Sequence, residues 1–562
     1  MRAPGNMKHD QTSSPGHDRR FRREWLRPDV IAGLTTSAVV VPKSMAYATI
    51  AGLPVQVGLY TAFIPMVIYA LLGSSRPLSV STTTTLAILT GSALGLAAPG
   101  GGPAELAVAA ATLAVLVGVM LVAASVLRLG FVANFISEPV LSGFKSAIGV
   151  VIVVDQVPKL LGIHIHKEGF FRDLLAIVQQ APEASLVTVL LSIALLVLIF
   201  GMDRLLPRAP APLVAVALAI LASAVLGLPA AGVETVGEVP RGLPAFTWPQ
   251  VALVVQLWPA ALGIALMSFT ESIAAGRAFA DPKEPRPVPN RELLATGLAN
   301  VGGGLFGAMP AGGGTSQTAV NRGAGARSQV AGLVTAAVAL ATLLLLAPLI
   351  ALMPQAALAA VVIATSLGLI QPAEFAEIRR VRTIEFRWAL IAFAGVLLLG
   401  TLKGIVVAVI VSLLGLAAQS YNPPVYALGR KRGTTVFRPV SPEHPDDEQF
   451  PGLLMIRVEG RVFFANAQRV GDAIWPMIDR AAPSVVLLDC RAITDLEYTA
   501  LKMLGEAEER MRTDGRELWL AGLNPDVFEV VERSKVGRTL GHGRMFLNVQ
   551  AAVEKFQQRG ER

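Results

Sequence analysis

Long apolar stretches follow one another from residue 29 to residue 421, separated by short breaks that contain proline, glycine or charged residues. An α-helix needs about 20 apolar residues to cross the hydrocarbon part of a bilayer. Most stretches approach or exceed this length, so the pattern predicts fourteen membrane segments. They lie at residues 29–51, 56–73, 79–96, 104–127, 137–161, 174–201, 210–229, 251–277, 290–308, 315–324, 328–353, 355–371, 386–400 and 403–421.

The pattern changes after residue 421. Residues 422–451 are rich in proline and charge, and we expect them to be a linker. Beyond them, short aliphatic runs alternate with amphipathic stretches of helical length, which is typical of a small α/β domain. We expect this domain to occupy residues 452–562. Its strands are predicted at 453–464, 484–490 and 517–522, and its helices at 467–481, 499–512 and 525–534.

Charge separates the same two parts. Charged residues make up 16% of the 562 residues, against about 25% in an ordinary soluble protein, so a soluble enzyme is excluded. Residues 422–562 hold 20 Lys or Arg and 20 Asp or Glu, whereas the much longer stretch 29–421 holds 21 and 17. The net charge of +8 therefore lies outside the C-terminal domain. The lipid bilayer is an expected partner, and nucleic acid is not.

The basic residues also predict an orientation. Residues 1–28 are polar, with arginines clustered just before the first apolar segment, and we expect a cytoplasmic N-terminal tail. If the segments alternate from that side, fourteen Lys or Arg fall in cytoplasmic loops and five in outside loops. This bias favours an even number of segments. Both termini are then cytoplasmic, and the protein is expected in the cell membrane, inner or plasma.

Two segments begin with small and polar residues where an apolar span is expected. The third begins near Ser81, Thr82 and Thr83, and the tenth begins at Gly314-Thr315-Ser316-Gln317. Each is the third in a set of seven, the placement that an inverted repeat requires. Helix N-termini offer free N–H groups and partial positive charge. We expect the two half-helices to bind an anion. The alternative is that the Ser and Thr hydroxyls bond within a tightly packed bundle.

Two charged residues stand inside other segments. Lys43 is in the first and Glu271 in the eighth, which are equivalent across the repeat. A charge within a span is costly and indicates function. We expect Lys43, with Ser44 and Tyr47 beside it, to contact the anion. We expect Glu271, with Thr270, to carry a coupling H⁺ or Na⁺. The alternative is a structural ion pair between Lys43 and Glu271.

Other features predict less chemistry. Lys145 lies closer to the end of the fifth segment, and we expect its side chain to extend toward the membrane surface as a structural residue. The sequence contains no Walker A phosphate-binding loop and no His or Cys at metal-ligand spacing. We therefore expect no enzyme activity, no metal and no organic cofactor.

Longer motifs add a resemblance. They read Pro42-Lys-Ser-Met-Ala-Tyr-Ala-Thr-Ile-Ala-Gly-Leu-Pro54, Gly58-Leu-Tyr60 and Tyr69-Ala-Leu-Leu-Gly-Ser-Ser-Arg-Pro-Leu-Ser-Val80. These motifs strongly resemble the SulP family of sulfate permeases and related anion transporters. Thr318-Ala-Val-Asn321 with Ala324-Gly-Ala-Arg327 is similar to that family's tenth segment. Residues 452–562 are similar to its C-terminal STAS domain.

The resemblance implies a fold and a mechanism. The fold is a polytopic α-helical membrane protein of fourteen segments in two inverted repeats of seven, followed by the α/β STAS-like domain. A core domain of segments 1–4 and 8–11 would move against a gate domain of segments 5–7 and 12–14, in an elevator-like motion. The anion would lie between the third and tenth segments. Homodimers are implied, and the family's anions include sulfate, bicarbonate, chloride and dicarboxylates.

The sequence departs from the family pattern at the expected binding positions. Gln is common in the family where Lys43 stands, and Arg is common near Gln317. The Ser-Val-Gly-Pro that often opens the third segment is Ser79-Val80-Ser81-Thr82 here. These differences indicate that the positive charge has moved from the tenth segment to the first. They leave anion transport as the expected function and the identity of the anion open.

The STAS-like domain departs from its relatives at a loop. Bacterial antagonists of this kind are phosphorylated in a segment ending Asp-Ser-Ser/Thr-Gly, where this chain has Tyr498, Thr499 and Ala500. Thr499 is a candidate phosphate acceptor. The preferred reading makes Thr499 the N-cap of the following helix. A cytoplasmic protein is a further candidate partner of this domain.

The expected function is secondary active transport of a small inorganic anion, sulfate-like or bicarbonate-like, coupled to H⁺ or Na⁺. A carboxylate at the place of Glu271 resembles that of cation-coupled members. The alternatives are an uncoupled anion exchanger or channel of the same fold, and a dicarboxylate transporter.

Overall fold

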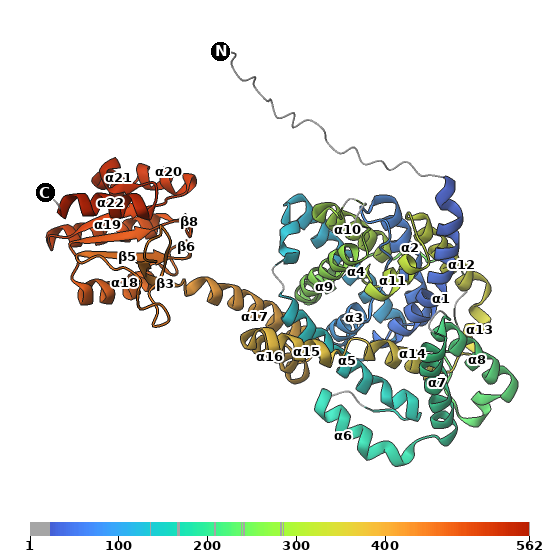
Figure 1. Ribbon diagram of the computed structural model, residues 1–562. Coiled ribbons are helices and arrows are strands. Elements are labelled where there is room, and N and C mark those ends of the chain that lie inside the picture. The colour runs from blue at the N-terminus through green and yellow to red at the C-terminus, as the bar shows by residue number, and fades with distance from the viewer. Residues whose placement is uncertain are drawn as a thin grey trace. The chain divides into compact units, whose positions relative to one another are not determined.

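The computed structural model describes residues 23–134, 137–165, 169–206, 209–237, 239, 242–281, 284 and 286–560. The first 22 residues of the expected N-terminal tail lie outside this part. The chain divides into two compact units, with the boundary between Ser412 and Leu413 (Figure 1). The first unit is helical, and the second combines helices with a β-sheet. The two hydrophobic patterns in the sequence thus correspond to two kinds of architecture.

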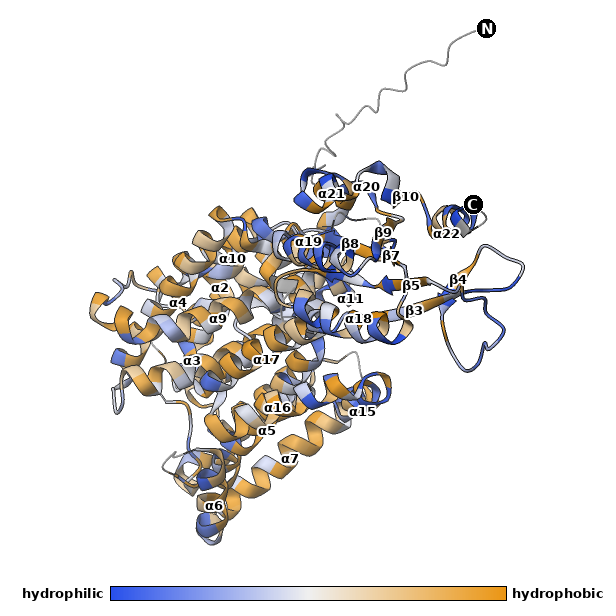
Figure 2. Ribbon diagram, turned by 90° about the vertical axis from the view of Figure 1, so that its left-hand side faces the viewer, coloured by the Kyte–Doolittle hydropathy of each residue, from blue (hydrophilic) through white to orange (hydrophobic). Residues whose placement is uncertain are grey.

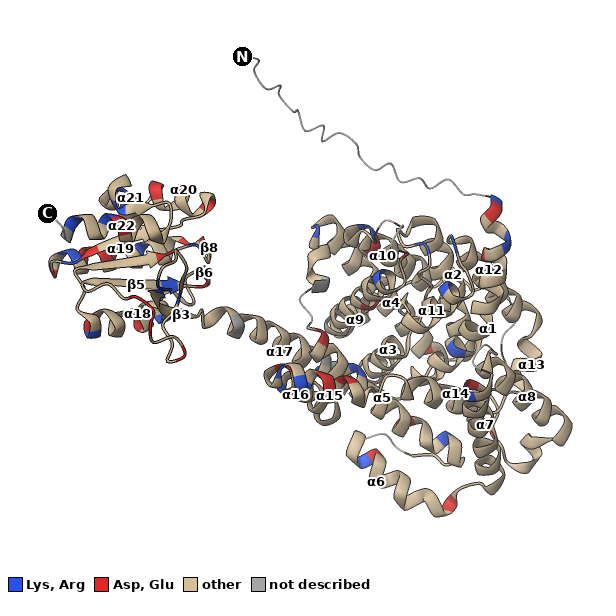
Figure 3. Cartoon of the chain, viewed as in Figure 1, with Lys and Arg blue, Asp and Glu red and all other residues tan. Residues whose placement is uncertain are grey.

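The helices of the first unit are apolar on their outer surfaces as well as inside. Among the described residues, seven helices are long and apolar enough to cross a membrane, and four shorter apolar helices accompany them. Figure 2 shows hydrophobic residues along most of these helices, and Figure 3 shows their charged residues mainly near helix ends. Leu190, Leu218 and Leu262 are among the exposed apolar side chains. Such surfaces suit contact with lipid rather than water.

One group of helices corresponds to the expected core domain. Within it, α4 packs along α10, and α1 and α2 pack along α12 and along each other. A Cβ atom added at Gly118 would lie 2.6 Å from the carbonyl oxygen of Gly297, so glycine permits the close contact of α4 with α10. The group comprises α1 (Leu26–Ile50), α2 (Val55–Leu72), α3 (Thr84–Ala97), α4 (Pro103–Val126), α9 (Val251–Ala278), α10 (Pro289–Leu305), α11 (Thr315–Gly323), α12 (Val330–Leu345) and α13 (Ala347–Ala351).

A second group corresponds to the expected gate domain. In it, α5 packs against α14 and α16, and α7 packs against α8 and α14. The two groups meet where α1 contacts α8 and α14, and where α3 contacts α5. The group comprises α5 (Glu138–Leu161), α6 (Phe170–Gln180), α7 (Leu186–Leu205), α8 (Ala211–Leu226), α14 (Gln355–Leu367), α15 (Pro372–Val381), α16 (Thr383–Leu399) and α17 (Thr401–Tyr421).

Two helices of this group differ from the sequence prediction. The single segment expected at 174–201 is divided into α6 and α7, because a short 3-10 turn at Ala181–Glu183 interrupts it and Ser185 caps α7. In α6 only Ile177 is buried, while Phe171, Leu174, Leu175 and Val178 are exposed. The charged helix α15 was not expected as a separate element. Both helices are too short and too polar to be membrane spans.

The second unit is built around a six-stranded sheet with the strand order β10-β9-β7-β5-β3-β4. Its three central strands, β9, β7 and β5, run parallel to one another. One apolar cluster joins the sheet to α18–α21, and another joins it to α22. The elements are β3 (Val425–Arg430), β4 (Phe437–Pro439), β5 (Leu453–Val458), β6 (Gly460–Val462), α18 (Ala467–Ala481), β7 (Val485–Asp489), β8 (Ile493–Leu496), α19 (Tyr498–Thr513), β9 (Glu517–Ala521), α20 (Pro525–Arg533), α21 (Lys535–Leu540), β10 (Met545–Phe546) and α22 (Val549–Gly560).

Two details of this unit differ from the expectation. The paired strands expected at 453–464 are β5 and β6, but they do not pair with each other. β5 lies between β3 and β7, whereas β6 pairs with β8. The expected linker 422–451 contains β3 and β4, and β3 is antiparallel to β5. Strand partners distant in the sequence are set by tertiary packing, which the local pattern does not contain.

The single cysteine gives a test of this packing. Cys490 follows β7 and is buried, and burial together with the Asp489 carboxylate raises the pKa of its thiol to about 12. Only the thiolate reacts with a maleimide. At pH 8 we expect labelling of the native chain to be at least ~10³-fold slower than labelling in guanidinium, where the thiol has its ordinary pKa of about 8.5. Intact-mass spectrometry measures both rates, and similar rates would contradict the buried position.

Candidate functional site

The third and tenth segments begin as two short strands that pair with each other. β1 (Val80–Ser81) is antiparallel to β2 (Gly312–Gly313), with Val80 opposite Gly313 and Ser81 opposite Gly312. Each strand leads into a half-helix, α3 after β1 and α11 after β2. The N-terminal ends of both half-helices therefore lie close to the strand pair, in the arrangement that the inverted repeat predicts.

Close packing against α9 fixes β2. A Cβ atom at Gly313 would lie 2.8 Å from Ser272 Cα, so only glycine fits there without a shift. The Ser272 hydroxyl accepts a hydrogen bond from the Gly313 N–H at 2.7 Å. The Ser268 hydroxyl donates to the Ala311 carbonyl at 2.7 Å. The half-helix α11 is thereby held to the helix that carries Glu271.

Gln317 joins the two half-helices. Its Nε2 donates to the Ser79 carbonyl at 2.9 Å, and its Oε1 accepts from the Ser81 hydroxyl at 2.8 Å. Both side chains are buried. Gln317 and Ser81 were expected to contact the anion. Their polar atoms hold the two half-helices together, and Gln317 also lines the cavity beside them, so its contact with the anion stays a prediction.

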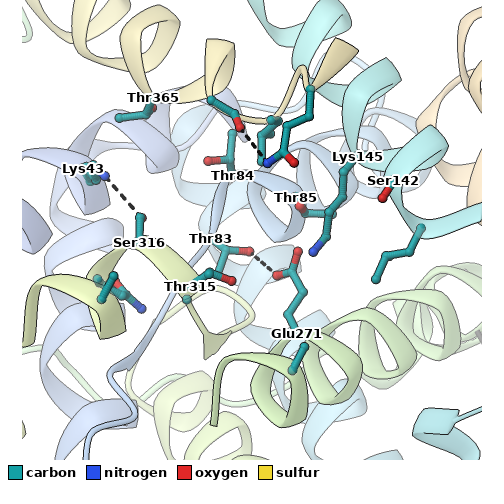
Figure 4. Close-up of a pocket in the computed structure, with 18 of the residues that line it drawn as sticks. Lys43, Thr83, Thr84, Thr85, Ser142, Lys145, Glu271, Thr315, Ser316 and Thr365 are labelled. Atoms are coloured by element: carbon teal, nitrogen blue, oxygen red, sulfur yellow. Dashed lines mark hydrogen bonds between the residues drawn. The ribbon is translucent and has the colours of Figure 1, made fainter. Parts of the chain in front are cut away.

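A cavity of about 500 Å³ lies beside the N-terminal ends of the two half-helices (Figure 4). Its volume is within the range of about 300–1,000 Å³ that small-molecule sites occupy. Within the described part of the chain, no group of three or more His, Cys, Asp or Glu is arranged to hold a metal ion. On the core side the cavity is lined by Lys43, Tyr47, Thr82, Thr83, Thr84, Thr85, Glu271, Gly314, Thr315, Ser316 and Gln317.

Lys43 and the start of α11 place positive potential at this cavity. Lys43 Nζ donates to the Ser316 hydroxyl at 3.3 Å (Figure 4). Ser316 is in the first turn of α11, whose N-cap is Gly314. Glycine has no side chain that can accept from the first N–H groups of the helix, so they lack a side-chain cap. An ammonium group and a helix N-terminus therefore lie together, an arrangement that attracts anions.

Glu271 faces the other half-helix. It is buried, and its Oε2 accepts a hydrogen bond from Thr83 Oγ1 at 2.9 Å. Thr83 is the N-cap of α3, and its Oγ1 also accepts a hydrogen bond from the Leu86 N–H at 3.3 Å. The alternative ion pair is not formed, since Lys43 bonds to Ser316 and Glu271 bonds to Thr83. Among the described residues, Glu271 has no cationic partner within ion-pair distance.

Two other expected residues, Ser44 and Thr270, are not among those that line the cavity. The Ser44 hydroxyl donates to the carbonyl three residues earlier at 3.0 Å, and the Thr270 hydroxyl donates to the carbonyl four residues earlier at 2.7 Å. Such bonds to a helix's own backbone are common for Ser and Thr. Sequence neighbours of Lys43 and Glu271 therefore face other directions, since successive helical residues are about 100° apart.

Thr499 lies in the other unit, in the first turn of α19. The N-cap of this helix is Glu497, and the helix begins at Tyr498. The prediction that Thr499 is the N-cap is therefore wrong by two positions. Its side chain is exposed, so a phosphate acceptor there stays a prediction.

The gate side of the cavity was not anticipated. It is lined by Glu138, Ser142 and Lys145 from α5, with Glu374 from α15 and Gln371 just before it. The three α5 residues have the spacing i, i+4, i+7, which places them on one face of the helix. The Ser142 hydroxyl donates to Glu374. This polar stripe within an apolar segment was the signal in the sequence that could have revealed it.

Comparison with known proteins identifies the family. The model of the sulfate permease family matches residues 26–392, and the model of the STAS domain matches residues 444–552. The chain belongs to the sulfate permease family. A probable sulfate transporter of Mycobacterium tuberculosis is 33% identical over 546 residues, which cover 96% of this chain and 97% of that protein. The present protein is thus a membrane anion transporter with a C-terminal STAS domain, and not an enzyme.

Solved structures give the same fold. The murine Slc26a9 anion transporter in its inward-facing state superposes with a TM-score of 0.89 over 96% of this chain and 93% of that one, at 22% identity. The transmembrane domain of a cyanobacterial bicarbonate transporter, BicA, gives a TM-score of 0.60 over 69% of this chain and 98% of that one, at 25% identity. The helical unit of this sulfate permease family member is therefore a multi-pass membrane domain.

Proposed function

We propose that this protein is a secondary active transporter of a small inorganic anion, sulfate-like or bicarbonate-like, coupled to H⁺ or Na⁺. The observation that carries the proposal is the position of Lys43 beside the uncapped N-terminus of α11. Positive potential from an ammonium and from a helix dipole at one cavity favours an anion over a neutral solute. The relative from M. tuberculosis is named a probable sulfate transporter, and one structural neighbour is named a bicarbonate transporter.

Glu271 supports the coupling part of the proposal. A carboxylate inside a membrane domain needs a neutralising partner, and among the described residues Glu271 has only a hydroxyl bond from Thr83. A bound proton or Na⁺ would neutralise it. Because Glu271 and Lys43 line the same cavity, the coupling ion and the anion would occupy one compartment and be carried together.

The two groups of helices support alternating access. The half-helices, Lys43 and Glu271 belong to the core, whereas α5, α14 and α15 form the opposite wall of the cavity. We propose that the core moves against the gate in an elevator-like motion and carries the site across the membrane. We further propose a homodimer in the cell membrane with both termini cytoplasmic, and a cytoplasmic protein as partner of the STAS domain.

Uptake into proteoliposomes tests the proposal. Radiolabelled sulfate, bicarbonate and a dicarboxylate are offered separately, with and without an inward H⁺ or Na⁺ gradient. We expect saturable uptake of at least one inorganic anion and accumulation above equilibrium when one cation gradient is imposed. Uptake that never exceeds equilibrium would favour the uncoupled exchanger or channel. Transport of only the dicarboxylate would replace the proposed substrate class, and no uptake of any anion would contradict the proposal.

A further inference from the structure

Lys145 is a second cation at the same cavity, and it comes from the gate. It lies on α5, whose other cavity-lining polar residues are Glu138 and Ser142. The side chain extends from α5 toward Glu271 and Thr85 (Figure 4). The sequence predicted a structural residue that extends toward the membrane surface, whereas in this structure the side chain lines the cavity.

Within the described part of the chain, no side chain neutralises the Lys145 ammonium. It is half-buried, and among the described residues it has neither a hydrogen-bond acceptor nor an ion-pair partner. Glu271, toward which it points, is bonded to Thr83 instead. A charge in a membrane helix without a fixed partner indicates contact with water or with a charged ligand. The cavity supplies the space for either.

Two carboxylates, Glu138 and Glu374, line the gate side of the cavity. Glu138 is the first residue of α5, and Lys145 is two turns further along the helix, or about 10 Å by the rise per residue. Glu374 lies on α15 and accepts a hydrogen bond from Ser142. The remaining carboxylate, Glu271, faces Lys145. If Glu271 carries the coupling cation, the cavity is lined by two ammonium groups, and its remaining charged carboxylates are Glu138 and Glu374 of the gate, of which Glu374 is bonded to Ser142.

We propose that Lys145 is a second anion contact, contributed by the gate, and that the cavity therefore selects a divalent oxyanion. This inference rests on the proposed function, because it assumes that Glu271 is neutralised by the coupling ion. Lys43 approaches the anion from the core and Lys145 from the opposite wall. The Coulomb energy of each ammonium with the anion is proportional to the anion's charge, so each cation favours a dianion twice as strongly as a monoanion.

The test compares two tetrahedral anions that differ by one charge. Sulfate uptake gives a KM, and competition by perchlorate gives an inhibition constant, for the full-length protein in proteoliposomes. In Lys145→Met we expect both constants to rise. The rise for sulfate should be about the square of the rise for perchlorate, for example about ninefold against threefold, because the Coulomb energies differ by a factor of two. Lys145→Gln provides a second neutral variant, and Lys145→Arg should remain near the wild-type values.

A matched control is Lys403→Met, which removes an exposed lysine that does not line the cavity. It should change neither constant. Equal rises for the two anions in Lys145→Met, or no rise for either, would overturn the proposal. So would an unchanged KM with loss of the response to the cation gradient, since Lys145 would then be the counter-ion of Glu271. A wild-type protein that transports bicarbonate and does not bind sulfate would exclude dianion selection while leaving anion transport intact.

Discussion

Lys43→Met is expected to lower Vmax/KM for anion uptake about 100-fold. A unit charge about 4 Å from an anion contributes ~4 kcal/mol at the effective dielectric constant of about 20 that suits partly exposed sites. Solvent in the cavity reduces this contribution, and about 2.8 kcal/mol corresponds to a factor of 100. Met preserves the length and much of the volume of the lysine stem, so packing around the half-buried α1 position changes little. The bond from Lys43 to Ser316 is lost together with the charge.

Lys43→Arg is the matched control for this prediction. It preserves the charge and can still donate to Ser316, although a guanidinium group has a different shape from an ammonium. We expect the Arg variant to retain at least about one third of wild-type Vmax/KM and the Ser316→Ala variant to lie between the two, since it removes only a neutral hydrogen bond. Measurements are made on reconstituted protein whose monodispersity matches wild type. A Met variant within threefold of wild type would show that Lys43 does not contact the anion.

The membrane part could be predicted well because its physics is local in the sequence. Lipid requires apolar helices of a given length, so hydrophobic runs give the segments directly. The polar starts near Thr83 and Gly314 interrupt this rule, and the structure places them at the ends of the paired strands β1 and β2. Lys43 and Glu271 could also be recognised in the sequence as candidate site residues, since charges inside membrane segments are rare. All four positions line the cavity.

The parts that could not be predicted depend on direction and on distant partners. Ser44 and Thr270 adjoin the charged residues but bond to their own helices. Gln317 is polar and at the right place, yet its amide bonds to β1. Which of several polar residues faces a cavity depends on the rotation of the helix about its axis. The sequence predicts helix boundaries only to within a few residues, which does not determine that rotation.

The cavity wall formed by α5 could not be predicted for the same reason. Lys145 could be recognised as a charge in the fifth segment, but two of the carboxylates that line the same cavity, Glu271 on α9 and Glu374 on α15, are more than 100 residues away in the sequence. Only the assembled core and gate show that this lysine faces Glu271. The STAS domain gives a parallel case, since β3 joins the sheet beside β5 although its surroundings have the composition of a linker.

Glu271→Gln is expected to abolish gradient-driven accumulation while preserving downhill anion movement within about threefold of wild type. Gln has the size and shape of Glu, and its carbonyl oxygen can accept the hydrogen bond from Thr83 that Glu271 accepts at 2.9 Å. It cannot bind a proton or hold Na⁺ by charge. The cap of α3 and the packing of α9 therefore remain, and the substitution removes the coupling function with little change in the fold. Counterflow of the labelled anion measures downhill movement, and uptake under an imposed H⁺ or Na⁺ gradient measures coupling.

Glu138→Gln and Glu374→Gln are the matched controls, because they make the same chemical change at the same cavity. Neither carboxylate lies on the core helices that carry the half-helix site, and both variants should still accumulate anion when the gradient is applied.

Thr83→Val tests the contact between Thr83 and Glu271. It removes the hydroxyl that donates to Glu271 and caps α3. Coupling should therefore weaken, and loss of the cap should lower the stability of the half-helix by about 1 kcal/mol. Full accumulation by Glu271→Gln would exclude Glu271 as the coupling site. Loss of accumulation in all three glutamine variants would assign coupling to the charge of the whole cavity rather than to one carboxylate.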